Sequence, residues 1–172
     1  MLRKQAFVFA GMMLAVVVLI VLWINRAQVL PFPVPLEDDA AARLAFVARW
    51  LIIPGLALLA VAIWLAYRCF FLADAIDGTR APESRALEIN LRYNQNALEQ
   101  TVLATIAWTG LALALPHGDL ALIPALAILF GAARAMFWIG YLISPSARAL
   151  GFALTFYPTV AAFIWLALRA AG

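Results

Sequence analysis

Three polar side chains stand at regular intervals where the most polar stretch of the chain, residues 84–104, runs into an apolar segment. Arg92, Asn96 and Glu99 are spaced i, i+4, i+7, so on a helix they share one face. A charge at the depth of Glu99 is costly in a bilayer and usually faces a bundle interior or a wet cavity. The spacing therefore predicts a polar binding site at this helix entrance.

These residue types suit a ligand that carries carboxylate, ammonium and amide groups. The planar guanidinium of arginine donates to a carboxylate through two parallel hydrogen bonds and stays charged when partly buried. The Glu99 carboxylate suits an ammonium group, and Asn96 can both donate to and accept from amides.

A second group of candidates lies further along the chain. Arg134 and Tyr141 are seven residues apart and again share one helix face. Arg148 follows a helix-breaking Ser-Pro-Ser at the start of the last apolar segment. A cation there stands close to the positive end of a helix, and the two together would stabilise a bound anionic group.

Structural interpretations of the same residues remain open. Arg92 and Glu99 could form an interfacial pair that reaches the lipid headgroups. Arg134 could form an ion pair with Glu99, Tyr141 could belong to an interfacial aromatic belt, and Arg148 could be a positive-inside anchor.

Composition identifies the chain as an all-α integral membrane protein. Its 172 residues are 67% hydrophobic and 12% charged, with a mean hydropathy of +0.98, whereas soluble domains are about half apolar and a quarter charged. The net charge of +3 and the absence of a basic cluster argue against nucleic acid as a partner. One cysteine, one histidine and scattered acidic residues offer no metal-ligand set.

Five hydrophobic stretches are long enough to cross a bilayer. They are expected at residues 6–24, 44–72, 88–115, 120–143 and 147–168. The first is read as a retained span rather than a signal peptide, because it is long and no small-residue cleavage site follows it. Pro54-Gly55 is expected to bend the second.

The distribution of basic residues predicts the orientation. With the N-terminus in the cytoplasm, the inner side holds seven basic residues and the outer side four, as the positive-inside rule requires. In a bacterium this would be the inner membrane. All six candidate site residues would then lie near the cytoplasmic face.

Two motifs resemble those of the MAPEG family, the membrane-associated proteins of eicosanoid and glutathione metabolism. The stretch from Arg92 to Glu99 resembles the R-x-x-x-N-x-x-E signature that opens the family's second helix. The stretch from Arg134 to Tyr141, followed by Ser144 to Arg148, resembles its third helix and the next loop. The resemblance covers residues 44–172, which makes the first span an additional element.

The resemblance implies a MAPEG-like four-helix bundle in residues 43–172, preceded by an additional transmembrane helix and a proline-rich loop in residues 1–42. It also implies a homotrimer that binds glutathione, as co-substrate, between subunits. Arg148 would be the catalytic residue that activates the thiol, and the residues implied to bind glutathione are Arg92, Asn96, Glu99, Arg134 and Tyr141.

The chain departs from the family pattern at three positions near the site. Phe137 stands where Tyr or His is common, Gln100 where one branch has Tyr, and Phe152 where Tyr can follow the arginine. A hydroxyl-rich site is therefore not reproduced in full.

Two functions from different classes follow. The first is a membrane-bound glutathione-dependent transferase or peroxidase acting on lipophilic electrophiles that arrive from the bilayer. The alternative is a non-catalytic structural or accessory subunit of a membrane complex, which predicts a polar cluster that pairs internally. An added first helix favours the alternative slightly, because it suggests a new packing surface.

Overall fold

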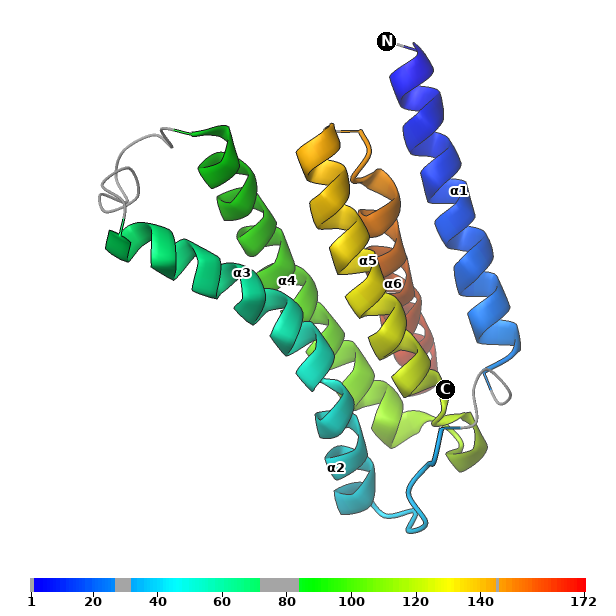
Figure 1. Cartoon of the computed structure of the whole chain (residues 1–172). Helices are drawn as coiled ribbons and strands as arrows, with labels where there is room; N and C mark the ends of the chain where they lie inside the picture. Colours follow the sequence, from blue (N-terminus) through cyan, green and yellow to red (C-terminus); the bar gives the residue numbers. More distant parts are fainter. Residues whose placement is uncertain (1, 27–31, 72–83, 145) are drawn as a thin grey trace.

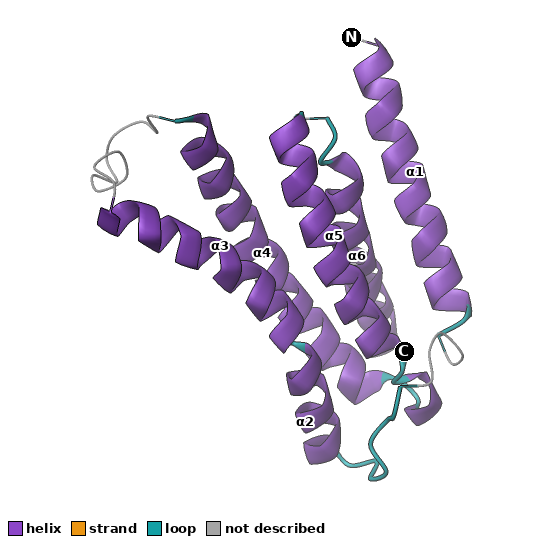
Figure 2. Ribbon diagram, in the orientation of Figure 1, coloured by secondary structure: helices purple, strands orange, loops and turns teal. Residues whose placement is uncertain are grey.

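The chain folds into long helices that run roughly alongside one another (Figure 1). The structure, a computed structural model, describes the backbone of residues 2–26, 32–71, 84–144 and 146–172, with side chains from residue 5 onward. Its helices are α1 (Leu2–Ile24), α2 (Ala40–Trp50), α3 (Ile52–Phe71), α4 (Arg85–Ala114), α5 (Leu122–Ile143) and α6 (Ala149–Ala171), with a short 3-10 helix, η2 (His117–Asp119), before α5. No strand occurs in the described residues (Figure 2).

Within the described residues, five segments are long and apolar enough to span a membrane, which confirms the expected number. They cover Gln5–Ile24, Ala40–Phe71, Arg85–Ala114, His117–Ile143 and Ala149–Ala171. The protein is therefore a multi-pass, all-α membrane protein. Which terminus faces the cytoplasm stays a prediction, as does the division into residues 1–42 and 43–172.

The second span bends where the sequence predicts it. Pro54 has no backbone N–H and its ring clashes with the carbonyl four residues earlier, so a helix kinks in the turn before a proline. The break falls at Leu51, between α2 and α3. Beyond it α3 leans away from α5 toward its C-terminal end (Figure 1).

Both ends of α4 are fixed by side chains. At its start the Ser84 hydroxyl accepts a hydrogen bond from the Leu87 N–H at 3.2 Å, which satisfies one of the donors left free in the first turn. At its end Arg43 NH1 donates to the carbonyls of Ala112 at 2.9 Å and Leu115 at 2.7 Å. These contacts set the position of the helix that carries Arg92, Asn96 and Glu99.

Helix α5 is the most enclosed of the spans and packs closely on α6. A Cβ built at Gly151 would lie 2.6 Å from the Ala133 carbonyl oxygen and would also collide with the Phe137 N–H group. A Cβ at Gly140 would lie 2.6 Å from the Ala147 carbonyl oxygen. Glycine at these two positions allows the backbones to approach, as in other membrane helix pairs.

Helix α1 packs against α6 on the outside of the bundle formed by α2 to α6 (Figure 1). At Gly11 a Cβ would lie 3.4 Å from the Cβ of Leu150, in the first turn of α6. The start of α1 therefore lies beside the end of the bundle at which α4 and α6 begin and α5 ends.

Candidate ligand-binding cleft

A cleft of about 400 Å³ opens at this end of the bundle, where four helices meet. Its wall is made by α1, α4, α5 and the start of α6, through Val8, Arg92, Asn96, Phe137, Tyr141, Arg148, Ala149 and Phe152. Four of the six candidate site residues thus line one cleft, although they come from three separate helices.

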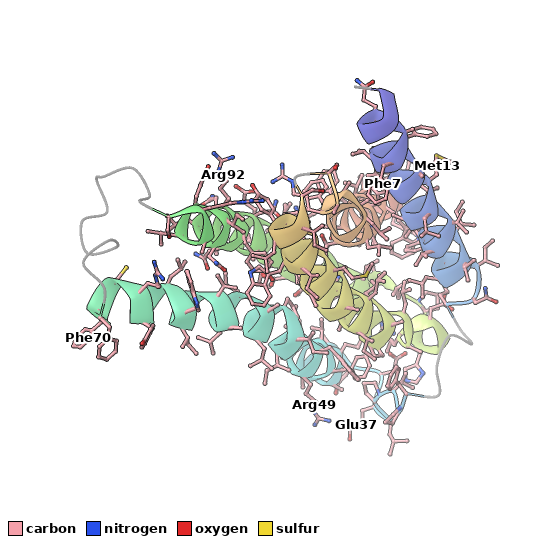
Figure 3. The ribbon with its side chains drawn as sticks, turned by 45° about the horizontal axis from the view of Figure 1, so that its top comes forward. Phe7, Met13, Glu37, Arg49, Phe70 and Arg92 are labelled. Atoms are coloured by element: carbon pink, nitrogen blue, oxygen red, sulfur yellow. The ribbon has the colours of Figure 1, made fainter. Side chains whose placement is uncertain are left out.

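Arg92 forms the outer rim of the cleft. It pairs with Glu88 at 2.7 Å, one turn earlier on α4, and 64% of its side chain is exposed. Figure 3 shows it at the opposite end of the molecule from Glu37 and Arg49. An exposed pair of this kind contributes little to stability, so Arg92 can exchange Glu88 for an anionic ligand at small cost.

Arg148 stands directly before α6, at its N-cap position. Its guanidinium lies 4.3 Å from the ring centre of Tyr141, a cation–π contact that holds both side chains. Tyr141 is 8% exposed, so it is buried rather than part of an outer aromatic belt. A smaller recess of about 190 Å³ is also lined by Arg92, Tyr141 and Arg148. Arg92 and Arg148 therefore line both the cleft and this recess.

Arg134 is fully buried behind the cleft. Its guanidinium lies 4.3 Å from the ring centre of Phe137 and 5.2 Å from that of Tyr93, and its NH1 donates to Asn96 Oδ1 at 2.9 Å. Because arginine only donates, the Asn96 oxygen must face Arg134. The Asn96 NH2 group, a donor, is left for other partners, and Asn96 also lines the cleft.

Glu99 is not brought into the cleft. It is exposed, and it accepts a hydrogen bond from Gln95 at 2.9 Å. Glu99 forms an ion pair with neither Arg92 nor Arg134 in the described chain, although the sequence left both pairs open. Arg134 bonds to Asn96 and Arg92 bonds to Glu88 instead. Arg92, Asn96 and Glu99 share a broad helix face. Arg92 and Asn96 line the cleft, whereas Glu99 is exposed outside it.

Sequence reasoning missed two residues of the wall. Val8 comes from α1, which lies outside the residues that carry the motifs, and nothing in its local sequence marks it. Ala149 is a neighbour of Arg148 and could have been found from that position. Phe137 and Phe152 were noted only as departures, and they make the inner wall apolar.

The cleft combines two guanidinium groups and one amide donor with an apolar wall of Val8, Phe137 and Phe152. Such a site can hold an anionic head group while an apolar molecule lies against the same wall. Among the described residues no group of three or more potential metal ligands occurs.

The model of the MAPEG family matches residues 6–168. The chain belongs to the MAPEG family. The match includes most of α1 and all the cleft residues, so this MAPEG chain carries its candidate site within the part shared with the family.

Two curated relatives are similar to this MAPEG chain. Transmembrane protein 79 of Mus musculus is 28% identical over 142 residues, and that of Bos taurus is 26% identical over 138 residues. Each match covers 79% of this chain and 34% of the relative, so the chain spans about a third of the length of the relatives it matches. No solved structure matches the chain significantly.

Proposed function

We propose that this MAPEG protein binds glutathione in the cleft and delivers its thiolate to a lipophilic electrophile, as a transferase. The observation that carries the proposal is the convergence of Arg92 and Arg148, from α4 and the start of α6, on one partly apolar cleft. Glutathione has two carboxylates, and these two guanidinium groups are the cations that line the cleft.

Each polar residue of the cleft suits a different group of glutathione because of its position. Arg92 at the rim suits a carboxylate, and the NH2 group of Asn96 suits a carboxylate or peptide carbonyl. Arg148 lies deeper, against Tyr141, and its charge would stabilise the thiolate. Glu99 would meet the ammonium group only if a neighbouring subunit completed the site, as in the homotrimer that the sequence motifs imply.

In the proposed reaction the lipophilic electrophile reaches the cleft from the membrane. The cleft wall at Val8 and Phe152 is apolar and lies between α1 and α6, so a lipophilic electrophile can approach along these helices. The thiolate sulfur would attack its electrophilic carbon, forming a C–S bond and expelling the leaving group. Attack on a peroxide oxygen would instead form an S–O bond and break the O–O bond, which releases the alcohol and leaves a sulfenic acid. A second glutathione would then reduce the sulfenic acid, giving glutathione disulfide and water.

Turnover tests this mechanism. Conjugation of glutathione to a hydrophobic aryl halide should be measured for purified wild type and for Arg148→Gln. Loss of the thiolate-stabilising cation should lower kcat by at least tenfold, with KM for glutathione changed much less. Arg169→Gln, at the other end of α6, is the matched control and should retain wild-type rates. Equal rates for wild type and Arg148→Gln would contradict the assignment of Arg148.

A non-catalytic accessory subunit is the second candidate, and one observation favours it. Arg134 is bonded to Asn96 and Arg92 to Glu88, which is the internal pairing that this function predicts. Phe137 and Phe152 also bring no hydroxyl group to the cleft wall. This candidate predicts that the folded protein neither binds glutathione at millimolar concentration nor conjugates it.

A further inference from the structure

A groove of about 390 Å³ lies between α1 and α6, toward the C-terminal ends of both helices, whereas the cleft lies beside their starts. The groove shares no lining residue with the cleft, and its lining is entirely hydrophobic. Trp23, Ala161 and Trp165 are partly buried and form its floor, while Ile164 and Leu168 are 56% and 70% exposed along its rim. The small side chain of Ala161 between larger neighbours leaves the hollow open.

The groove has the length and the setting that suit a lipid acyl chain. Both of its walls lie within membrane spans, Gln5–Ile24 and Ala149–Ala171. Residues 161–168 of its α6 wall cover roughly 10 Å along the helix axis, which is most of the roughly 15 Å that one leaflet contributes to the hydrocarbon core. Trp23 and Trp165 meet edge to face, with ring centres 6.1 Å apart, and tryptophan is typical of the level where hydrocarbon meets headgroups. A chain lying in the groove would therefore have its headgroup near the ends of α1 and α6.

An arginine stands at this end of the groove. The Arg169 guanidinium lies 5.1 Å from the ring centre of Trp165, which lines the groove. Arg169 is exposed and forms no ion pair with a described residue. Arg26 lies at the same end, since its NH1 donates to the Trp23 carbonyl at 3.0 Å, but it pairs with Asp119 at 2.8 Å. Arg26 and Asp119 neutralise each other, which leaves the charge of Arg169 uncompensated beside the groove.

We infer that the groove binds one phospholipid that carries a net negative charge. Its phosphate contacts Arg169, because a guanidinium donates two parallel hydrogen bonds to phosphate oxygens, and one acyl chain lies along Trp23, Ala161 and Trp165.

The charge of the headgroup decides which lipid fits. A zwitterionic lipid would place its own cation beside Arg169, whereas an anionic headgroup brings no such repulsion. The cation–π contact with Trp165 holds the guanidinium beside the groove before a lipid arrives, so little side-chain ordering is needed on binding. An anionic phospholipid is therefore preferred over a zwitterionic one with the same acyl chains.

Lipid binding measured by native mass spectrometry tests this preference. Purified, delipidated protein is titrated with dioleoyl phosphatidylglycerol, which is anionic, and separately with dioleoyl phosphatidylcholine, which is zwitterionic. Wild type should bind one phosphatidylglycerol more tightly than phosphatidylcholine. Arg169→Gln should weaken phosphatidylglycerol binding at least about fivefold and remove the preference, because one charge-assisted contact is lost. Arg49→Gln, which removes the same charge from another exposed arginine, is the matched control and should bind both lipids as wild type does.

Photolabelling tests the position of the lipid. A phosphatidylglycerol with a diazirine in one acyl chain should label residues 19–24 and 161–168 preferentially, as mapped by peptide mass spectrometry. Ala161→Leu fills the floor of the groove and should suppress this labelling, whereas Ala66→Leu, at an exposed position on α3, should not.

Two outcomes would overturn the inference. One is phosphatidylglycerol binding that is equal in wild type and Arg169→Gln, and the other is labelling spread evenly over all five spans, which is the pattern of ordinary surrounding lipid. The inference does not depend on glutathione chemistry, because the groove and the cleft share no residue. A protein that binds phosphatidylglycerol here but conjugates no glutathione would keep this lipid site and lose the proposed function.

Discussion

Arg134 NH1 and Asn96 Oδ1 are joined by a 2.9 Å hydrogen bond that links α5 to α4. The bond fixes the orientation of the Asn96 amide, because its oxygen must face the guanidinium. One side chain of the cleft is thereby held by a residue that does not line it.

Asn96→Leu should destabilise the protein by about 1–2 kcal/mol, because it removes the acceptor of the hydrogen bond that Arg134 NH1 donates. Thermal unfolding of detergent-solubilised protein, followed by tryptophan fluorescence, measures the change. Gln95→Leu, an exposed change on the same helix, is the control and should leave the unfolding temperature nearly constant. A smaller effect for Asn96→Leu than for Gln95→Leu would contradict the importance of the bond.

Gly151→Ala should separate α5 from α6 at the floor of the cleft. The new methyl group would lie 2.6 Å from the Ala133 carbonyl oxygen, and since this neighbour is backbone the helices must move apart. Overpacking of this kind costs about 1–3 kcal/mol, measured as a fall in unfolding temperature. Gly55→Ala, where nothing lies within 4 Å of the added carbon, should be neutral or slightly stabilising. Similar results for the two variants would refute the close approach.

Arg43→Met should loosen the C-terminal end of α4. The guanidinium satisfies the Ala112 and Leu115 carbonyls and also donates from Nε to Asp38 at 2.6 Å. Removing it leaves carbonyls at the helix end without their partner, at a cost of about 1–3 kcal/mol. Amide hydrogen exchange should accelerate in the last turns of α4. Arg49→Met, exposed on α2, is the comparison, and equal exchange in both variants would count against the Arg43 cap.

Hydrophobic length and helix-breaking residues were sufficient to predict the five spans and the bend near Pro54, since both depend on local sequence. The cleft was predictable in part, because helical periodicity places Arg92 and Asn96 on one face and Arg134 and Tyr141 on another. Periodicity gives no rotation of one helix relative to its neighbours. For that reason the outward position of Glu99 and the choice of Asn96 as the partner of Arg134 could not be derived.

The contribution of α1 to the cleft could not be predicted from the sequence, for a related reason. Val8 is an ordinary residue of an apolar span, and its place in the wall depends on how α1 packs against α6, where Gly11 meets Leu150. The helix pair is set by shape complementarity between distant segments, which a single sequence does not display. An aliphatic residue of this kind becomes a site residue only through tertiary packing.

Calorimetric titration of glutathione into the purified, detergent-solubilised protein tests the central claim most directly. Wild type should show saturable binding, and Arg92→Ala and Arg148→Ala should each weaken it by at least about tenfold, since each removes a charge-assisted contact. Arg49→Ala, at the opposite end of the bundle (Figure 3), should bind as wild type does. Absence of heat at millimolar glutathione from a folded protein would contradict the glutathione site and favour the accessory subunit.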